Sequence, residues 1–272
     1  MKKKIILGKK YNFLIPILHP NLSRLGNNED GGYILDLNVL KKVKHLLSFG
    51  VGDNWTFEEA CLKKNPQIII KIFDYSIDIK EFYKSFFKYI RRFLTFRSNF
   101  KSIKNTFKIL KNYNDFKKFF KKKNIFYYPN KITQSSNSKL DKSLIDILYS
   151  INGKVIIKCD IEGDEYNLLN NLNSHLKNVE IILVEFHWVE KNFNSFKKII
   201  LQLKKNYNIV HFHVNNNSIF KKSNKMPDYI ELTFLRKKNN LDSKKRYYFP
   251  IRNLDFPNNP NISDYSVHFS QT

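Results

Sequence analysis

Short apolar stretches alternate along the chain with segments in which apolar residues recur every three or four positions. The short stretches are rich in β-branched and aromatic residues, and several are apolar at consecutive positions, as strands buried on both faces must be. We predict strands within His45–Val51, Gln67–Tyr75, Asn124–Ile132, Gly153–Gly163, Glu180–Trp188, Tyr207–Val214 and Tyr229–Lys237.

The segments between these stretches show the period of amphipathic helices. We expect helices over 57–64, 143–151, 166–176 and 194–205. Strands that alternate with helices indicate right-handed crossovers and a parallel sheet. Only the last two stretches lack a helix between them, so they should pair as an antiparallel hairpin. The pattern therefore predicts a doubly wound, mostly parallel α/β fold in a single domain, 1–272, with an irregular tail from Asn253 packed over the sheet or the site.

A basic, aromatic-rich segment, 79–131, interrupts this order between the second and third strands. From Lys80 to Lys131 it holds 16 Lys and Arg residues against two acids, so most of the net charge of +24 falls there. Its periodicity predicts a helical insertion. The insertion is either a solvated helical cap or a surface for an anionic membrane, a nucleic acid or a phosphorylated substrate.

Few sequence features suggest secretion. The apolar run near the N-terminus stops at Gly8, which is too short for a signal peptide, and no stretch is long enough to span a membrane. Cys61 and Cys159 are far apart in apolar surroundings, so neither a disulfide framework nor a zinc site is expected. We therefore expect a cytoplasmic protein.

A glycine turn follows the first predicted strand, where open α/β sheets bind ligands. Gly50 and Gly52 would let the chain turn sharply and bring backbone N–H groups close to a ligand. Asp74 ends the next strand, 22 residues after Gly52. A carboxylate at that place can accept hydrogen bonds from both hydroxyls of a ribose. The two features together indicate a nucleoside site.

The turn disfavours a dinucleotide. A dinucleotide fingerprint has a third glycine where this chain has Trp55, and Asp53 would repel a pyrophosphate. An acidic loop suits S-adenosylmethionine, which carries a positive sulfonium and no phosphate.

Six motifs resemble the FkbM-type methyltransferases, class I enzymes that use S-adenosylmethionine. They are "RLGNNEDGGYIL", "LSFGVGDN", "FDYS", "IKCDIEGDEYNLL", "LVEFHW" and "HFHVNN" to "YIELTF". The resemblance covers nearly the whole chain apart from the insertion. It implies a seven-stranded sheet, methyl transfer to a hydroxyl, and a place in polysaccharide or natural-product pathways. It also implies that the cofactor contacts the glycine loop, the acid after the second strand and the "EDGGY" turn. These residues are Gly50, Gly52, Asp53, Asn54, Asp74, Tyr75, Asp30, Gly31, Gly32 and Tyr33. The alternative for the "EDGGY" turn is a purely structural role.

Ionisable side chains end three successive predicted strands. They are Asp160 and Glu162, Glu185 and His187, and His211 and His213. Members of each pair share a face of their strand, so all could converge on one pocket. Methylation of a hydroxyl requires a base near the proton that leaves, and histidine suits that task at neutral pH. We predict that His187 is the base, oriented by Glu185 or Asp160, with His211 or His213 as the alternative.

Other roles are open for the same edge of the sheet. Asp160, Glu185 or a histidine could bind Mg²⁺ or Mn²⁺. Glu162, Asn215 and Asn216 could bind the substrate, since amides hydrogen-bond sugar hydroxyls well, although Asn-rich loops are also ordinary turns.

The sequence thus predicts a cytoplasmic O-methyltransferase that uses S-adenosylmethionine and acts on a sugar nucleotide or a related surface-polysaccharide precursor. The excess of positive charge agrees with a phosphorylated acceptor. No nucleic acid partner is expected, and the insertion could contact a membrane surface. The alternatives are a nucleotide-dependent oxidoreductase on the same fold, or a non-catalytic basic module that binds nucleic acid or membrane.

Overall fold

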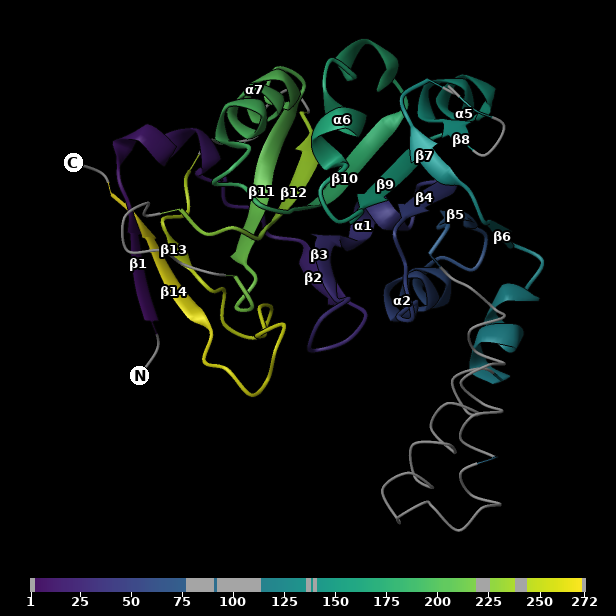
Figure 1. Ribbon diagram of the computed structural model, residues 1–272, viewed down its shortest axis with the longest axis horizontal. Coiled ribbons are helices and arrows are strands. Elements are labelled where there is room, and N and C mark those ends of the chain that lie inside the picture. The colour runs from purple at the N-terminus through teal and green to yellow at the C-terminus, as the bar shows by residue number, and fades with distance from the viewer. Residues whose placement is uncertain are drawn as a thin grey trace.

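A seven-stranded sheet forms the centre of the protein in a computed structural model (Figure 1). The structure describes residues 3–76, 91, 114–135, 138, 141–218, 226–237 and 244–270. The strand order is β11-β12-β10-β9-β4-β5-β6. The bounds are β4 His45–Phe49, β5 Ile69–Phe73, β6 Ile125–Tyr128, β9 Val155–Cys159, β10 Val179–Phe186, β11 Tyr207–Val214 and β12 Ile230–Arg236.

The pairing confirms the predicted fold class. β6, β5, β4, β9 and β10 run parallel to one another, and β12 lies antiparallel between β10 and β11. The predicted hairpin is therefore β11–β12, although the chain continues beyond it. The third predicted strand ends early, at Tyr128, and a separate short strand, β7 Lys131–Thr133, pairs with β8 Asp141–Ser143. Pro129 explains the break, because proline has no N–H for the ladder.

Helices cover both faces of the sheet, as the runs of fully buried strand residues require. α5 Leu144–Ser150, α6 Glu165–Leu169 and α7 Phe193–Leu203 lie on one face, and α1 Leu37–Leu40 and α2 Thr56–Lys64 lie on the other (Figure 1). Each face has its own apolar core. α6 is shorter than predicted because Asn170 is extended, with a φ of −65° and a ψ of 131°, which ends the helix before the short 3-10 turn Asn173–His175.

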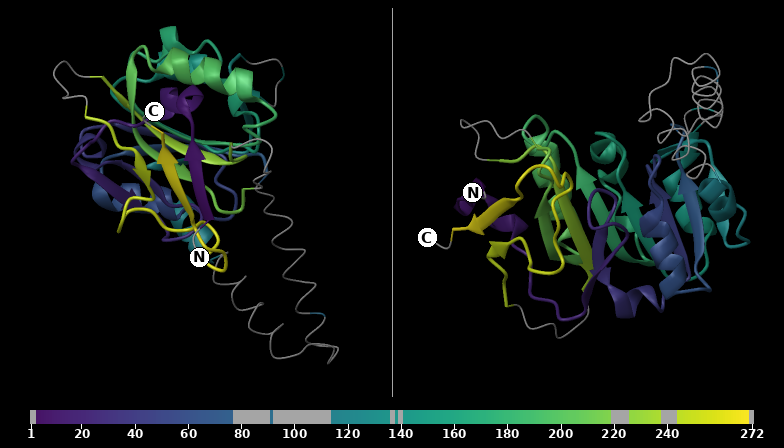
Figure 2. Two further views of the ribbon diagram at one scale, coloured as in Figure 1. Left: turned by 90° about the vertical axis from the view of Figure 1, so that its left-hand side faces the viewer. Right: turned by 90° about the horizontal axis from the view of Figure 1, so that it is seen from below.

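The two ends of the chain meet in a small sheet beside the main one. β1 Lys3–Leu7 pairs in parallel with β14 Tyr265–Phe269, and β13 Tyr248–Phe249 completes the sheet (Figure 2, left). A 3-10 helix, Lys9–Leu14, follows β1. The prediction of a wholly irregular tail was wrong, because alternate residues of β14 are buried, the pattern of a half-buried strand.

The glycine-rich turn near residue 30 belongs to a hairpin. β2 Leu22–Leu25 pairs antiparallel with β3 Tyr33–Asp36, and the turn between them lies next to the ends of the central strands. β2 and β3, which were not predicted, hold the turn at the carboxyl edge of the sheet, where it lines the cavity.

Most of the predicted insertion lies outside the described residues, namely 79–90 and 92–113. Within its described part, residues 114–120 are helical. Phe116, Phe119 and Phe120 of this helix contact the ring of Trp55, so these aromatic positions form core. None of the helices in the described ranges is long and apolar enough to cross a bilayer.

Candidate functional site

A cavity of about 290 Å³ opens at the carboxyl ends of β4, β5 and β9. Open α/β sheets bind ligands at this place. Its wall consists of the loops that follow these strands, the β2–β3 turn and residues near β7. The lining residues are Asp30, Gly31, Gly50, Val51, Gly52, Asp53, Asn54, Phe73, Asp74, Tyr75, Ser76, Asn130, Lys131, Ile132, Lys158, Asp160, Ile161, Glu162 and Asp164.

Two glycines shape the loop after β4. Gly50 has a φ of 70°, and a Cβ there would lie 1.6 Å from the backbone oxygen of Asp160, so only glycine fits. Gly52 has a φ of 57°, and a Cβ there would meet no atom within 4 Å. Gly52 therefore leaves room in the cavity wall for a ligand to approach the backbone.

Asp74 holds this loop to the end of β5. Its Oδ2 accepts hydrogen bonds from the N–H groups of Val51 and Gly52, both at 2.8 Å. Its Oδ1 accepts from the N–H of Ser76 at 2.8 Å and from the Ser76 hydroxyl at 2.6 Å. Two acceptances per oxygen use the capacity of a carboxylate. Asp74 lines the cavity as predicted, and a ribose would have to replace one of these donors, most simply the Ser76 hydroxyl.

The β2–β3 turn closes one side of the cavity. Asn54 Nδ2 donates to the backbone oxygen of Asp30 at 2.8 Å and so ties this turn to the glycine loop. Burial raises the pKa of Asp30. The Tyr33 hydroxyl donates to Asp160 Oδ2 at 2.7 Å. The turn thus contacts both the predicted cofactor loop and the predicted catalytic acid.

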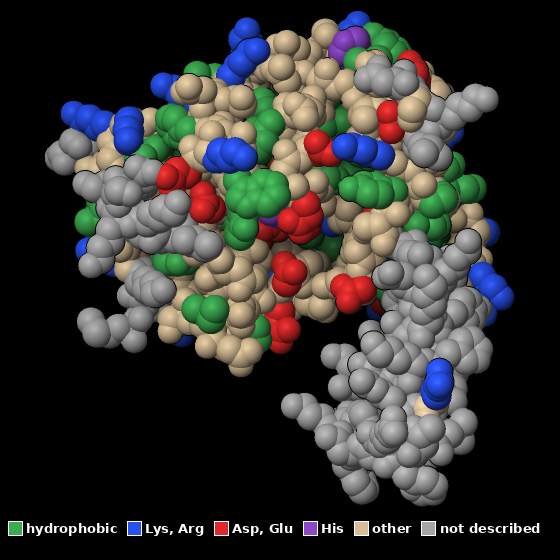
Figure 3. Space-filling view, viewed as in Figure 1, with side chains coloured by type: hydrophobic (Ala, Val, Ile, Leu, Met, Phe, Trp, Pro, Cys, Tyr) green, Lys and Arg blue, Asp and Glu red, His purple; other side chains and the backbone are tan. Residues whose placement is uncertain are grey.

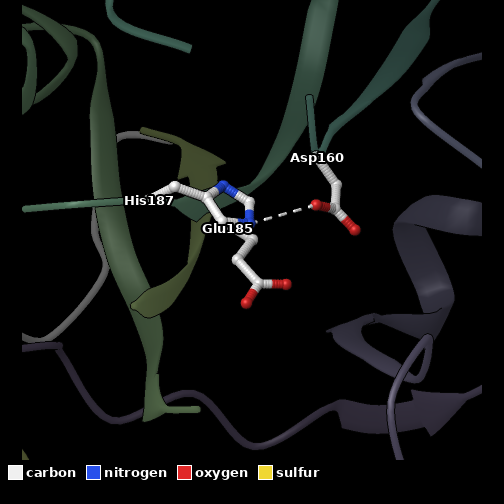
Figure 4. A group of neighbouring side chains, drawn as sticks. All are labelled: Asp160, Glu185 and His187. Carbon is white, nitrogen blue, oxygen red and sulfur yellow. Dashed lines mark ion pairs between the residues drawn. The ribbon is translucent and has the colours of Figure 1, made fainter. Parts of the chain in front are cut away.

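Asp160, Glu185 and His187 come together at the ends of β9 and β10 (Figure 4). One ligand atom from each lies within 4.8 Å of the other two. His187 Nε2 is 3.8 Å from Asp160 Oδ1 and 3.6 Å from Glu162 Oε2, too far for hydrogen bonds. Asp160 and Glu162 line the cavity, whereas Glu185 and His187 are buried behind them. The structure therefore groups three of the five predicted catalytic residues.

Glu165 orients His187, although it is not among the predicted site residues. Its Oε1 accepts from His187 Nδ1 at 2.9 Å and from the N–H groups of Ile161 and Gly163. A carboxylate only accepts, so Nδ1 carries a proton and Nε2 faces Asp160. Glu165 is the last residue of "DIEGDE", so the position of this acid in the motif was the available signal.

Charges around the cluster shift the pKa of two of its members. Burial by itself lowers the pKa of His187, but the hydrogen bond with Glu165 and the charges of Glu185, Glu165 and Asp160 raise it to about 9. Burial raises the pKa of Glu185 well above its ordinary value, and the charges of Asp160 and Glu231 add to the effect. At neutral pH His187 is therefore protonated and must lose that proton before it can act as a base.

His211 and His213 lie elsewhere, under the C-terminal tail. His211 Nε2 is 2.7 Å from Asp255 Oδ1, and His213 lies 3.4 Å from Glu231 and 3.3 Å from Asp264. Neither histidine lines the cavity. Both have the geometry of buried ion pairs that hold the tail on β11 and β12.

The two predicted substrate amides are also bound within the protein. Asn215 Nδ2 donates to Glu185 Oε1 at 2.7 Å. Asn216 Nδ2 donates to the backbone oxygens of Asn259 and Ile262, both at 2.8 Å, and so fixes the tail. Neither amide lines the cavity.

Acidic side chains dominate the cavity wall although the protein is strongly basic. The wall contains six acids and two lysines. Lys131 pairs with Asp164 at 2.5 Å, and Lys158 donates to the Gly50 backbone oxygen at 2.5 Å. Acidic side chains also gather near the centre of the face in Figure 3. Such a wall attracts a cation more than an anion.

Ten of the predicted site residues line the cavity: Asp30, Gly31, Gly50, Gly52, Asp53, Asn54, Asp74, Tyr75, Asp160 and Glu162. Gly32 and Tyr33 lie beside it. Lys158, Lys131 and Asn130 line it without having been predicted. Lys158 is buried within a strand, and only its place two residues before Asp160, on the same face, could have indicated it.

No protein-family model matches the chain, and no curated protein sequence matches it. Among solved structures, fibrillarin from Methanococcus jannaschii, a pre-rRNA processing protein, has 11% sequence identity and a TM-score of 0.39. That match covers 72% of this chain and 68% of that chain. Precorrin-6y C5,15-methyltransferase from Geobacter metallireducens has 11% identity and a TM-score of 0.38, with 74% and 86% covered. A putative caffeoyl-CoA O-methyltransferase from Staphylococcus aureus has 9% identity and a TM-score of 0.33, with 73% and 82% covered. Likeness this distant carries no argument about function, and membership of the FkbM-type family stays a prediction.

Proposed function

We propose that this protein is an S-adenosylmethionine-dependent methyltransferase that methylates a hydroxyl of a sugar nucleotide or a related polysaccharide precursor. The observation that carries the proposal is the acidic cavity at the carboxyl ends of β4, β5 and β9, with the open backbone of Gly52 in its wall. Its volume of about 290 Å³ lies at the lower end of the range for small-molecule sites.

The residues of the cavity fit a cationic nucleoside. Asp74 lies at the tip of β5, where a ribose would reach it, and Asp53 and Asp30 add negative charge near the glycine loop. When bound, S-adenosylmethionine would supply the methyl group that replaces the proton of the acceptor hydroxyl, with S-adenosylhomocysteine as the by-product. The chain's own contribution is to hold the two molecules in line and to place the Asp160, Glu185 and His187 cluster beside the reacting hydroxyl.

The dinucleotide alternative is less well supported by the same wall. Trp55, in place of a third glycine, packs against Phe116 and Phe119, and the wall offers a pyrophosphate no lysine without a partner among the described residues. The phosphorylated acceptor meets the same difficulty inside the cavity. It remains a proposal that depends on residues at the cavity mouth.

The test is calorimetric titration of the purified chain with S-adenosylmethionine, S-adenosylhomocysteine and NAD⁺. We expect binding of the first two and none of NAD⁺. Gly52→Ala should weaken binding at least about tenfold, because its Cβ would enter the space that the ligand needs. Gly153→Ala is the matched control, since Gly153 also has a positive φ, of 113°, but lies away from the cavity.

Three results would count against the proposal: no binding of either adenosyl compound, binding of NAD⁺ alone, or equal effects of the two glycine variants. Acceptor use is then tested with labelled methyl donor and three acceptor classes, which are nucleotide sugars, sugar phosphates and unphosphorylated polyols. A product formed only from unphosphorylated polyols would remove the phosphorylated acceptor and keep the methyltransferase.

A further inference from the structure

Three side chains at the ends of β9 and β10 have the arrangement of a cation site. Asp160, Glu185 and His187 each offer one ligand atom, and these atoms lie within 4.8 Å of one another. Two ligands of one Mg²⁺, each at about 2.1 Å, lie about 3 to 4 Å apart. The 3.8 Å between His187 Nε2 and Asp160 Oδ1 falls within that range. Small side-chain shifts would therefore bring all three onto one ion.

Each member of this group has one possible ligand atom without a hydrogen bond among the described residues; for His187 it is Nε2, which has Glu162 Oε2 3.6 Å away. Asp160 Oδ2 accepts from Tyr33, and Lys158 lies 3.8 Å from the same oxygen, but Oδ1 accepts no hydrogen bond. Glu185 is only 4% exposed. One of its oxygens accepts from Asn215, and the other has neither a hydrogen bond nor an ion pair within the described chain. A carboxylate buried in this way is costly unless a cation lies beside it. In the metal-free chain the charge of protonated His187 supplies part of that balance, and a metal ion would take its place as His187 gives up its proton.

The surroundings of His187 fix the atom that faces the group. The buried carboxylate of Glu165 holds Nδ1, and the Tyr166 hydroxyl donates to the backbone oxygen of His187 at 2.7 Å. Metal-binding histidines usually donate their second ring N–H to such a carboxylate, which sets the orientation of the ring. Glu165 thus holds the imidazole in the orientation that a metal ligand requires.

We propose that Asp160, Glu185 and His187 bind one divalent cation of the Mn²⁺ or Mg²⁺ type. Two carboxylates and one imidazole suit hard and intermediate divalent ions, and the two negative charges balance the charge of the ion. No other group of three or more such residues with this spacing occurs in the described part of the chain.

The cation site also restricts the chemical class of the methyl acceptor. This step rests on the proposed methyltransferase function. Three protein ligands leave about three positions of an octahedral ion for other oxygens. A vicinal diol can fill two of them, and it can reach the ion from the cavity because Asp160 and Glu162 stand in the cavity wall. The bound hydroxyl would lose its proton to water more readily, since the ion lowers its pKa. The acceptor class is therefore a compound with two adjacent hydroxyls.

The test measures Mn²⁺ binding to the EDTA-treated, dialysed chain by the electron paramagnetic resonance signal of free Mn²⁺, without any methyl donor. We expect one ion per chain, displaced by excess Mg²⁺. Asp160→Asn and Glu185→Gln should each weaken binding at least tenfold. Asp164→Asn is the matched control, because it removes a carboxylate from the same cavity wall but outside the group. A polyol with adjacent hydroxyls should change the spectrum of bound Mn²⁺, and its monodeoxy analogue should not.

Absence of Mn²⁺ binding by the folded wild-type chain would overturn the site, as would equal weakening by Asp164→Asn and Glu185→Gln. Equal spectra with the diol and its deoxy analogue would overturn the acceptor class. Mn²⁺ binding without any binding of S-adenosylmethionine would remove the proposed methyltransferase and leave the cation site standing. Circular dichroism of each variant shows whether a loss of binding comes from unfolding.

Discussion

Two groups of histidines and acids lie at the same end of the sheet and differ in how they are paired. Under the tail, His213 has Glu231 and Asp264 within 3.4 Å, and all three are buried. Beside the cavity, His187 Nε2 is 3.6 Å or more from Asp160 and Glu162. Both nitrogens of His213 thus have a carboxylate as ion-pair partner. In the group beside the cavity Glu165 binds Nδ1 of His187, and Nε2 has no hydrogen bond within the described chain and is available for a ligand.

The two groups differ even at neighbouring positions of adjacent strands. Glu185 of β10 and Glu231 of β12 are direct partners in the antiparallel ladder. Burial by itself raises the pKa of Glu231, but the bond and charge of His213 and the bond from Asn258 bring it below its ordinary value. The pKa of Glu185 is raised. Two glutamates that are partners in the ladder thus have different roles. Glu231 forms a structural ion pair, and Glu185 is a candidate metal ligand.

The largest effect is expected from His213→Ala. It leaves Glu231 and Asp264 buried without their shared cation, which should lower the free energy of unfolding by about 3 to 5 kcal/mol. Burial by itself lowers the pKa of His213, but its bonds to Asp264 and Glu231 raise it well above its ordinary value. The stabilisation is therefore complete below about pH 6.5, the pKa in the unfolded chain, and is lost as pH rises through the folded pKa.

Urea unfolding of both chains at pH 6 and at pH 9 to 10 checks this prediction. The difference between wild type and variant should be greatest at pH 6 and should shrink at high pH. His175→Ala is the control and should change stability little, because this histidine is half-exposed and its ring is hydrogen-bonded, among the described residues, only to the Tyr149 hydroxyl. A difference that grows as pH rises would contradict the assignment.

A smaller loss is expected from Glu231→Gln, about 2 kcal/mol of unfolding free energy. The amide keeps an oxygen for Asn258, but the charge that stabilises protonated His213 is removed. The same urea measurement at pH 6 checks it. Unchanged stability would show that Asp264 alone supports His213.

The same substitution at the ladder partner should act in the opposite direction. Glu185→Gln in metal-free buffer removes a buried charge whose burial and repulsion by Asp160 outweigh its attraction to protonated His187, so we expect a gain of about 1 kcal/mol. Thermal unfolding in EDTA and in excess Mn²⁺ measures it. Mn²⁺ should stabilise the wild type and not the variant. A loss of stability in EDTA would place Glu185 with the structural acids.

The main sheet and the cavity could be predicted from local sequence, and the role of each ionisable residue could not. Runs such as "VIIKC" and "IILVEF" identify buried strands by themselves, and the end of a parallel strand identifies the ligand edge. The partners of His211 and His213 are Asp255 and Asp264, 44 and 51 residues away in sequence. No local pattern reports such contacts, so the sequence could not distinguish the histidine beside the cavity from the two under the tail.

Asp74 shows the same limit at the other end of the cavity. Its position at the tip of β5 was predictable, but its use by the N–H groups of Val51 and Gly52 depends on how the glycine loop folds back. A strand-end acid can bind a ligand, a loop or both, and only the hydrogen-bond partners distinguish these cases.

The smallest effect is expected from Ser76→Ala. The substitution frees one acceptor position on the Asp74 carboxylate, which accepts four hydrogen bonds in the wild type. If Asp74 binds the ribose by exchanging the Ser76 hydroxyl for a ligand hydroxyl, the variant has no serine hydroxyl that competes with the ligand for Asp74 Oδ1. The affinity for S-adenosylmethionine should then rise about two- to fivefold, because one hydrogen bond contributes about 1 kcal/mol. Ser76→Thr keeps the hydroxyl and should leave affinity unchanged in the same calorimetric titration. A tenfold fall for Ser76→Ala alone would mean that the Ser76 hydroxyl helps to bind the ligand, and that Asp74 serves the loop rather than the ribose.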